Sequence, residues 1–563
     1  MLWCNVKIKE TNAYLNFSFD ASLISFIKKY CKTRSYDAET KTWKIAIPEY
    51  NQLKYVFQNT YSFNEMIEKI EKVDVNDFKE HFDINDIPLK LTLTDEQIKC
   101  VDWHINLPKS LNGCTMGLGK TAVAIATALW RKKHNNIKHC LIICGVSGNK
   151  YNWNDIEILK TCDEVPFLID GTGEERYKQF ENLPDNFFII CNIETLRLKT
   201  KNPIINIIKK QVDSGNIEMI VGDEFHKLKD PTTQSAKALL KLNTPYKLVM
   251  SGTFIMNSPL DLYVPLKFIG MEDESFYKYK NLYCVLGVFN EIKGFKNLKY
   301  LQQKLDRCMI RFTKDSLDLP PKKYFDKYVD MNAEQQQIYR ERCKYIYRNI
   351  QKVEFSSNPL SMLTQLRQIT GYSGIISDTI KESAKLDYME QLVKEILARG
   401  EKVIIYSIWT TITDEIANRL KDYKILLYTG KESNDARREA KKLFMENDNY
   451  KIIIGTISAL GTGETLTSAN NVIFVDEPWN KALKDQAEDR CHRLGQTKQV
   501  NIYTLITNNS IDVAVHNIIT KKGALSDKIL DGVDKQTQQE IVDEVFQNEI
   551  SCGNIRAKTK STL

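Results

Sequence analysis

A short glycine-rich segment, Met116-Gly117-Leu118-Gly119-Lys120-Thr121, opens a run of good helix formers that continues to Leu129. Glycine lets backbone N–H groups curl around an anion, and the N-terminus of a helix adds a partial positive charge. In such a turn Lys120 is placed to reach the β- and γ-phosphates of a nucleotide, and the Thr121 hydroxyl to ligate Mg²⁺. The first glycine of the usual pattern is replaced by Cys114. The segment therefore predicts a phosphate-binding turn between a strand and a helix.

An acidic pair follows an apolar run further along the chain. Residues 217–222 have the pattern of a buried strand, and Asp223 and Glu224 come directly after it. Sheets of α/β proteins place catalytic groups at the carboxyl ends of parallel strands. We expect Asp223 to hold Mg²⁺ and Glu224 to orient or deprotonate the attacking water. Such a pair is most often merely solvated, but its position after the phosphate loop favours ATP hydrolysis.

Residues 486–496 contain two arginines with helical spacing. Gln486, Arg490 and Arg493 fall at i, i+4 and i+7, so a helix would place them on one face. A separate apolar stripe at the same spacing predicts an anchor to a core: Leu483, Ala487, Cys491 and Leu494. Arginine stays charged and offers planar, bidentate donors to phosphate. The alternative is an ordinary amphipathic surface helix.

With these motifs in this order, the sequence resembles the Swi/Snf-type ATPases, the double-stranded-DNA-translocating branch of superfamily-two helicase-like proteins. The resemblance extends from about residue 91 to 525. It implies that Gln97 reads adenine and that Arg490 and Arg493 act as arginine fingers beside Gln486. It also implies coupling roles for Ser251, Gly252, Thr253 and Gly463, and a segment ending at Trp153 that faces the DNA backbone.

The chain departs from the family pattern at two places. Cys114-Thr115 replaces the usual acidic pair before the phosphate loop, which bears on nucleotide affinity or metal handling. Residues 459–467 lack the commoner Gly-Gly and Asn of motif V, which bears on the coupling of hydrolysis to movement.

Apolar runs alternate with helical patterns in two sets, which predicts an α/β protein with two tandem RecA-like, doubly wound parallel-sheet lobes and helical insertions. The expected strands are 140–146, 187–191, 217–222 and 246–250 in the first lobe, and 402–407, 424–428, 451–455, 471–476 and 500–506 in the second. The expected divisions are a small α+β domain at 1–60, an acidic linker at 61–90, lobe 1 at 91–255, a hinge with helical protrusions at 256–380, lobe 2 at 381–530 and a tail at 531–563.

The first 60 residues combine basic and aromatic side chains, with nine basic residues against five acidic ones. This composition suits DNA binding through phosphate neutralisation and base stacking, with Lys28, Lys29, Arg34, Lys41 and Trp43 as candidates. Alternatively, Trp43 simply builds the core of a very small domain. The order of residues resembles the HARP (HepA-related protein) domain of annealing helicases, which directs a translocase to forked DNA.

Composition constrains the compartment more than the activity. The net charge of 79 − 72 = +7 permits nucleic-acid binding without predicting it. The 13 cysteines form no regular framework, and His139, Cys140 and Cys144 are expected in a core strand rather than a metal site. No signal peptide and no apolar run of ~18 residues is evident, so we expect a soluble intracellular protein without a membrane partner. It would be cytoplasmic if bacterial or phage-encoded, and nuclear or viral if eukaryotic.

The sequence therefore predicts an ATP- and Mg²⁺-dependent translocase on double-stranded DNA, of the annealing or fork-remodelling type, acting on branched or forked DNA. A remodeller that displaces proteins from DNA is the first alternative. A strand-separating helicase and a DNA-binding protein with a weak ATPase are the others. Protein partners remain unknown at this stage.

Overall fold

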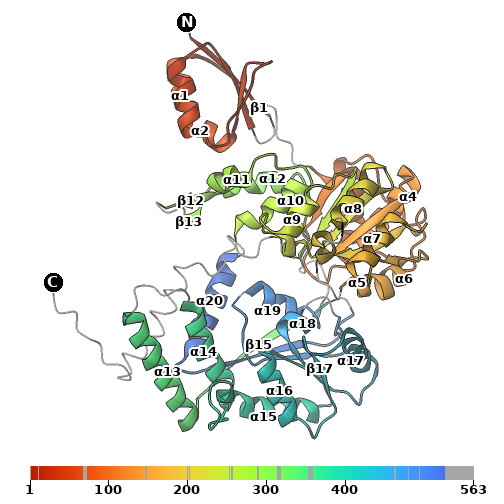
Figure 1. Cartoon of the computed structure of the whole chain (residues 1–563), viewed down its shortest axis with the longest axis vertical. Helices are drawn as coiled ribbons and strands as arrows, with labels where there is room; N and C mark the ends of the chain where they lie inside the picture. The colour runs from red at the N-terminus through yellow and green to blue at the C-terminus, as the bar shows by residue number, and fades with distance from the viewer. Residues whose placement is uncertain are drawn as a thin grey trace, which may run out of the picture. The chain divides into compact units, whose positions relative to one another are not determined.

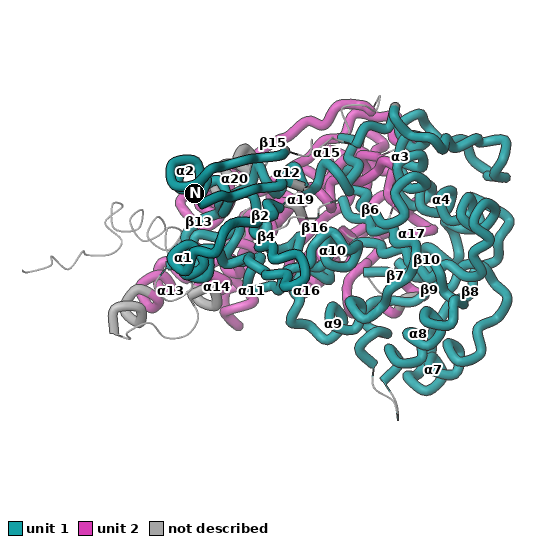
Figure 2. Tube along the Cα trace, turned by 90° about the horizontal axis from the view of Figure 1, so that it is seen from above, with its two compact units in different colours: residues 1–115, 119–255, 259–313 teal, residues 116–118, 256–258, 314–563 magenta. Residues whose placement is uncertain are grey.

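The computed structural model divides into two compact units, which Figure 2 colours separately. The first comprises residues 1–115, 119–255 and 259–313, and the second residues 116–118, 256–258 and 314–563. The structure describes residues 2–9, 12–67, 73–145, 149–198, 201, 203–252, 254, 258–287, 291–313, 319–352, 359–461, 465–479, 481–493 and 495–526. Thr253, Gly463 and the tail 531–563, all singled out above, lie outside the described residues.

The N-terminal part of the first unit is a small α+β domain with strand order β3-β4-β2-β1-β5. Strand β1 runs antiparallel to β2 and parallel to β5. Figure 1 shows α1 and α2 together on one side of these strands. The elements are β1 (Trp3–Lys9), β2 (Asn12–Phe17), α1 (Ala21–Tyr30), β3 (Ser35–Asp37), β4 (Thr42–Ala46), α2 (Ile47–Thr60) and β5 (Ser62–Ile67).

The predicted acidic linker is partly built into folded structure. Strand β5 lies within the range 61–90 and completes the N-terminal sheet. Further on, the backbone N–H of Phe82 donates to Asp102 at 2.6 Å, and Asp86 pairs with Lys133 and His134. These contacts fasten the end of the range to the helices of the first lobe. The N-terminal domain therefore extends to Ile67 rather than to residue 60.

The first lobe is built on a seven-stranded sheet with order β14-β6-β11-β10-β7-β9-β8, and its strand pairings are parallel. The strands are β6 (Lys109–Asn112), β7 (His139–Cys144), β8 (Phe167–Leu168), β9 (Phe188–Asn192), β10 (Ile217–Asp223), β11 (Tyr246–Met250) and β14 (Met309–Ile310). The helices around it include α3 (Asp95–Asn106), α4 (Lys120–Asn135), α5 (Asn149–Asn152), α6 (Ile158–Thr161), α7 (Gly173–Glu181), α8 (Ile204–Asp213) and α9 (Gln234–Leu239).

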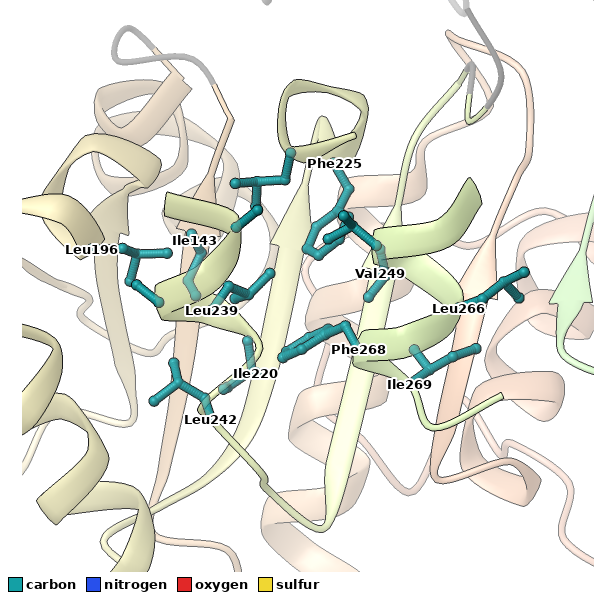
Figure 3. Close-up of a cluster of buried hydrophobic side chains, with 14 of the residues drawn as sticks. Ile143, Leu196, Ile220, Phe225, Leu239, Leu242, Val249, Leu266, Phe268 and Ile269 are labelled. Atoms are coloured by element: carbon teal, nitrogen blue, oxygen red, sulfur yellow. The ribbon is translucent and has the colours of Figure 1, made fainter. Parts of the chain in front are cut away.

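One face of this sheet packs against helices to form a large apolar core. Figure 3 shows Ile143 and Ile220 of the sheet facing Leu239 and Phe268 of the covering helices. Phe225, directly after the acidic pair, is 1% exposed and belongs to the same core. Its ring stacks on Phe268 with centroids 5.7 Å apart. Burial of Phe225 therefore anchors the chain just beyond Asp223 and Glu224.

A helical segment with a hairpin follows within the first unit. Figure 1 places α10, α11 and α12 near one another, with β12 and β13 beside α11. Strands β12 and β13 pair antiparallel. The elements are α10 (Tyr263–Phe268), α11 (Phe276–Tyr283), β12 (Cys284–Leu286), β13 (Ile292–Phe295) and α12 (Leu298–Leu305).

The second unit contains a six-stranded parallel sheet with order β15-β20-β19-β16-β18-β17. Its strands are β15 (Lys322–Val329), β16 (Val403–Ser407), β17 (Ile425–Tyr428), β18 (Ile452–Thr456), β19 (Asn471–Phe474) and β20 (Val500–Thr507). Its helices are α13 (Ala333–Lys352), α14 (Pro359–Gly371), α15 (Ala384–Ala398), α16 (Thr410–Arg419), α17 (Asn434–Glu446), α18 (Ile457–Leu460), α19 (Lys481–Glu488) and α20 (Ile511–Ser526).

Alternation along β16 divides the core of this unit into two layers. Val403 and Ile405 pack with α15 and α16, whereas Ile404 and Tyr406 pack with residues of α17, α18 and α19. Figure 1 shows the same arrangement, with α15 and α16 below the sheet and α18 and α19 above it. The two RecA-like parallel-sheet lobes predicted from the sequence are confirmed.

Candidate nucleotide site

Three neighbouring strands of the first lobe end at the same edge of the sheet. Strand β11 lies between β6 and β10, and all three are parallel. The glycine loop follows β6, Ser251 follows β11, and the acidic pair closes β10. The fold thus gathers at one edge three motifs that are up to about 140 residues apart in the chain, as the carboxyl-end rule for α/β sheets requires.

The glycine loop needs glycine for both its conformation and its packing. Gly117 and Gly119 have φ of +87° and +72°, the left-handed region that residues with a Cβ rarely adopt. A Cβ on Gly119 would also lie 2.2 Å from Nε2 of Gln97. Gly119 is the N-cap of α4, a helix of 16 residues, so the loop places its backbone at a positive helix end.

Lys120 is held against the loop by backbone carbonyls. Its Nζ donates to the carbonyl oxygens of Cys114 at 2.8 Å and Thr115 at 3.2 Å. Thr121 follows in the first turn of α4 and is partly exposed. Phosphate oxygens are stronger acceptors for an ammonium group than carbonyls, so these contacts can be exchanged for a nucleotide without leaving the lysine unsatisfied.

Gln97 takes part in a capping box at the start of α3. Its Oε1 accepts from the backbone N–H of Thr94 at 2.9 Å, and its own N–H donates to the Thr94 hydroxyl at 3.4 Å. The side chain is 7% exposed and turns its amide nitrogen toward Gly119. Gln97 therefore packs directly on the phosphate loop, and its adenine-reading role stays a prediction.

Asp223 is oriented by hydrogen bonds to both carboxylate oxygens. Oδ2 accepts from the Trp153 indole at 2.9 Å and from Asn149 at 3.5 Å, while Oδ1 accepts from the backbone N–H of Glu224 at 2.9 Å. Desolvation and then the neighbouring Glu224 charge raise the pKa of Asp223 to about 6, against the lowering effect of Trp153 and Lys120. A buried carboxylate beside a second negative charge is stabilised in its ionised form by a nearby cation.

The placement of Trp153 corrects one expectation. The indole is 2% exposed and donates to Asp223, so it does not form a surface for the DNA backbone. Trp153 instead positions the carboxylate. In the sequence, Trp153 stands as an isolated tryptophan in the polar run after residue 149. That pattern does not reveal its partner Asp223, which lies 70 positions further along the chain.

Glu224 and His226 link the acidic pair to Ser251. Glu224 has φ of +48°, and its carbonyl leaves no space for a Cβ at Gly145, which would lie 2.5 Å away. Its Oε2 is 3.2 Å from Nδ1 of His226, and the same nitrogen is 3.1 Å from the Ser251 hydroxyl. These contacts are buried. Ser251 belongs to the motif predicted to couple hydrolysis to movement. It thus contacts His226 directly in the segment 223–226, which we call the acidic box.

The residues present suit Mg²⁺ brought by a nucleotide. Among the described residues, no group of three or more His, Cys, Asp and Glu side chains gathers as a metal-binding cluster. Mg²⁺ commonly takes one or two protein ligands together with phosphate oxygens and water. The raised pKa of Asp223, with the Thr121 hydroxyl at the phosphate loop, fits such a site. His139, Cys140 and Cys144 are buried in the core strand β7, as expected.

In the second unit, the helix that contains Gln486 is shorter than the spacing predicted. Helix α19 ends at Glu488, and residues 489–493 form turns. Because of these turns, the Arg490 carbonyl accepts from the backbone N–H of Leu466 at 2.8 Å. The prediction of one helical face across residues 486–496 is therefore wrong. The predicted apolar anchor holds for Ala487 and Cys491, both 0% exposed; Leu494 lies outside the described residues.

The two arginines are nevertheless held by specific contacts. Arg490 Nε donates to the Gln486 carbonyl at 2.9 Å, and Arg493 Nη1 donates to the Thr465 hydroxyl at 2.8 Å. The buried Nε2 of Gln486 has no hydrogen-bond partner within the described part of the chain. Gln496 fixes the end of the segment by donating to the carbonyls of Ala469 and Cys491. A buried, unsatisfied amide on the residue whose carbonyl holds Arg490 is a donor that an anionic ligand could use.

The start of β15 anchors the same segment. Lys322 Nζ lies 3.0 Å from carboxylate oxygens of both Glu488 and Asp489, and these charges raise its pKa above the usual range against the effect of burial. His492 Nε2 is 2.8 Å from the Pro320 carbonyl. Pro320 and Lys322 lie in the predicted hinge range 256–380, and they hold residues 488–493, the arginine segment, in place. The spacing of residues along the sequence did not reveal these contacts.

The candidate DNA-binding residues of the N-terminal domain differ in their exposure to solvent. Lys28, Lys29 and Lys41 are exposed, whereas Arg34 is partly buried and donates to the Cys31 carbonyl at 2.8 Å. Trp43 is 8% exposed and packs in the domain core, with its ring centroid 4.9 Å from that of Tyr36. The alternative reading of Trp43 as a core residue is correct.

The chain matches two known protein families over adjoining ranges. Residues 96–374 match the SNF2-related domain, and residues 384–495 match the helicase conserved C-terminal domain. Over both ranges the chain resembles the Snf2-type ATPases. The matched ranges include the phosphate loop, the acidic box and the arginine segment. The matches do not distinguish an annealing-helicase branch within the Snf2-type ATPases.

Curated relatives are identical to this chain at about a quarter of the aligned positions. An uncharacterised ATP-dependent helicase of Mycoplasma pneumoniae is 26% identical over 507 residues, covering 86% of this chain and 47% of the relative. The ISWI chromatin-remodeling complex ATPase ISW1 of Saccharomyces cerevisiae is 24% identical over 478 residues, covering 77% of this chain and 40% of the relative. The chain thus spans less than half the length of these relatives.

Among solved structures, the Sulfolobus solfataricus SWI2/SNF2 ATPase core in complex with dsDNA is 24% identical, with a TM-score of 0.38. The alignment covers 86% of this chain and 100% of that one. Within the described residues, no helix has the length and apolar character needed to cross a membrane.

Proposed function

We propose that this Snf2-type ATPase hydrolyses ATP in response to double-stranded DNA and uses the energy to translocate along the duplex. The observation that carries the proposal is the gathering of the phosphate loop, the acidic box and Ser251 at one edge of the first sheet. The matches to the SNF2-related and helicase C-terminal domains support it.

In this proposal, Lys120 exchanges its two carbonyl contacts for phosphate oxygens when ATP binds. Thr121 and Asp223 would hold Mg²⁺, which when bound would neutralise charge that develops on the phosphate. Glu224 orients and deprotonates the attacking water. Arg490 and Arg493 act as arginine fingers in this proposal, the role that the resemblance to the family implies.

We further propose that the N-terminal domain directs the ATPase to branched or forked DNA. Support comes from the exposed face of α1. Phe26 and Tyr30 are 40% and 53% exposed, with ring centroids 4.3 Å apart, and Lys29 Nζ lies 5.2 Å from the Tyr30 ring centre. Unpaired bases at a junction stack on aromatic rings while lysines neutralise phosphates. The aromatic residue that the sequence pattern favoured for DNA contact was Trp43, not this pair.

A remodeller that displaces proteins from DNA is the second candidate. It is favoured by the similarity to ISW1, whose name describes a chromatin-remodeling ATPase. Both candidates require the same ATPase, so they differ in target rather than in chemistry.

The test is ATP turnover measured without DNA and with single-stranded, linear duplex and forked DNA. We expect duplex DNA to stimulate turnover at least tenfold, forked DNA to stimulate it further, and Lys120→Ala to abolish it. Equal turnover in all DNA states would contradict translocation on duplex DNA.

The N-terminal role is tested separately with Phe26→Ala combined with Tyr30→Ala. We expect the fork preference to disappear while stimulation by linear duplex remains. Tyr55→Ala, which alters a 76% exposed aromatic residue on α2, is the matched control. An unchanged fork preference in the double variant would reject the N-terminal role and leave the ATPase proposal standing.

A further inference from the structure

Two cysteine sulfurs join the phosphate loop to helix α3. Cys100 Sγ and Cys114 Sγ are 3.5 Å apart, and the two residues are 3% and 2% exposed. Cys100 lies one helical turn after Gln97, and Cys114 lies between strand β6 and the glycine loop. The pair therefore sits behind the residues that contact the nucleotide in the proposed site.

Cys114 has the surroundings of a reactive thiol. The backbone N–H of Phe312 donates to its sulfur at 3.4 Å. The hydrogen bond with Cys100, this N–H, and the positive charges of Lys120 and Arg311 lower the pKa of Cys114, against the effect of burial. In contrast, burial raises the pKa of Cys140 and Cys308. A buried thiol whose pKa is lowered and which lies 3.5 Å from a second cysteine sulfur has the chemistry of a redox sensor.

We propose that Cys114 and Cys100 are a peroxide-sensitive pair that forms a reversible disulfide and thereby weakens nucleotide binding. The Cys114 thiolate attacks one oxygen of hydrogen peroxide, the O–O bond breaks, and the departing hydroxide takes a proton to become water. The Cys100 thiol then attacks the sulfenic sulfur and displaces a second water. Two thiols and one peroxide give one disulfide and two waters, so the cysteines are oxidised and the peroxide is reduced.

Both cysteines are buried, so the proposal requires the loop to move before peroxide can reach Cys114. The loop residues 115–117, Gly119 and Lys120 are only partly buried. A bound nucleotide would cover the same loop. ATP is therefore expected to protect the cysteines from oxidation.

The disulfide acts on the loop through Cys114. A sulfur–sulfur bond is about 2.05 Å long, so the two sulfurs must approach by about 1.5 Å. The Cys114 carbonyl holds Lys120, and Gln97 on the cross-linked helix packs on Gly119. Tying α3 to the loop thus restricts both sides of the proposed phosphate site. The cross-link itself rests on geometry alone, whereas its effect on ATP rests on the proposed function.

The test treats the full chain with hydrogen peroxide, with and without ATP, and identifies cross-linked peptides by mass spectrometry without reduction. A fluorescent ATP analogue reports nucleotide binding in the same samples. We expect a Cys100–Cys114 peptide pair, an affinity at least tenfold weaker, recovery with dithiothreitol, and slower oxidation in the presence of ATP. Cys100→Ala should bind the analogue normally when reduced and lose the reversible response, whereas the buried control Cys308→Ala should retain it.

Each failure has a distinct meaning. Absence of the Cys100–Cys114 peptide pair in the wild-type chain would overturn the proposal, whatever the behaviour of the variants. Formation of the pair without a change in analogue affinity would overturn the regulatory effect. Failure of the reduced wild-type chain to bind the analogue would instead contradict the proposed ATP site.

Discussion

The indole of Trp153 donates a hydrogen bond to Oδ2 of Asp223 at 2.9 Å, joining a buried residue after β7 to the end of β10. Desolvation and the Glu224 charge raise the pKa of Asp223 to about 6, and the hydrogen bond from Trp153 keeps it from rising further. In the proposed site the ionised form is the one that holds Mg²⁺. Protonation of Asp223 therefore removes activity as the pH falls through about 6, and Trp153 limits that loss.

We predict that Trp153→Phe shifts the acidic limb of ATP turnover to higher pH. Without the indole N–H, the pKa of Asp223 rises further, because a hydrogen bond to a charged group is lost. Turnover at pH 6 should fall about fivefold if the pKa rises by about one unit, a change near 1.4 kcal/mol. Turnover at pH 8 should change much less. The measurement is a pH profile of turnover at saturating Mg²⁺.

The matched control is Trp103→Phe in the same lobe. Trp103 is 3% exposed, and its Nε1 has no hydrogen-bond partner within the described residues. Loss of that indole N–H should leave the pH profile in place. Equal shifts in the two variants would indicate a general packing defect rather than a role for Trp153 at Asp223.

We predict that Ser251→Ala separates hydrolysis from stimulation by DNA. The Ser251 hydroxyl lies 3.1 Å from Nδ1 of His226, which itself lies 3.2 Å from Glu224. Removing the hydroxyl should leave turnover without DNA within about twofold but reduce stimulation by duplex about tenfold, because a buried hydrogen-bond network loses its link to the acidic box. Turnover is measured with and without linear duplex.

Ser110→Ala provides the comparison, since Ser110 is also buried and its hydroxyl is 2.8 Å from Nδ1 of His104. It should cost stability without altering the ratio of stimulated to basal turnover. If both serine variants lose stimulation equally, the coupling role of Ser251 is wrong.

Much of the fold follows from sequence because parallel sheets have buried strands with long apolar runs. The predicted strands at 217–222, 246–250 and 471–476 agree with β10, β11 and β19 to within two residues. Strand β15 was missed because its sequence, Lys-Lys-Tyr-Phe-Asp-Lys-Tyr-Val, has four charged residues and neither an apolar run nor a regular alternation, as an edge strand can. Strand β6 was missed because it has only four residues.

The residues of the candidate site likewise fall into those that the sequence predicts and those that it does not. Residues whose role depends on local chemistry, such as Lys120 and the acidic pair, are recognisable from their neighbours in the chain. Roles that depend on contacts across the fold are not, as Trp153 with Asp223 and Lys322 with Glu488 show. The helix predicted beyond Glu488 failed for this reason, since the Arg490 carbonyl bonds to distant Leu466 instead of continuing the helix.

We predict that Lys322→Met destabilises the second unit. Lys322 sits 3.0 Å from oxygens of both Glu488 and Asp489, and the Glu488 side chain is 1% exposed. Removing one partner of a buried ion pair leaves an uncompensated charge and costs about 3 kcal/mol. The melting temperature should fall by several degrees in differential scanning fluorimetry. Lys323→Met, at the exposed neighbouring position of β15, should melt like wild type; a similar fall there would contradict the ion-pair explanation.

We predict that Arg493→Ala impairs ATP hydrolysis far more than ATP binding. An arginine finger acts on charge that develops in the transition state and is worth about 10³ to 10⁵ in rate in related chemistry. In the described structure Arg493 donates to Thr465, a contact that a phosphate oxygen can replace. Turnover should fall at least a hundredfold while affinity for an ATP analogue changes less than threefold. Arg438→Ala, at an exposed position of helix α17, should leave both unchanged. Equal losses of binding and turnover in Arg493→Ala would make Arg493 a ground-state ligand instead of a finger.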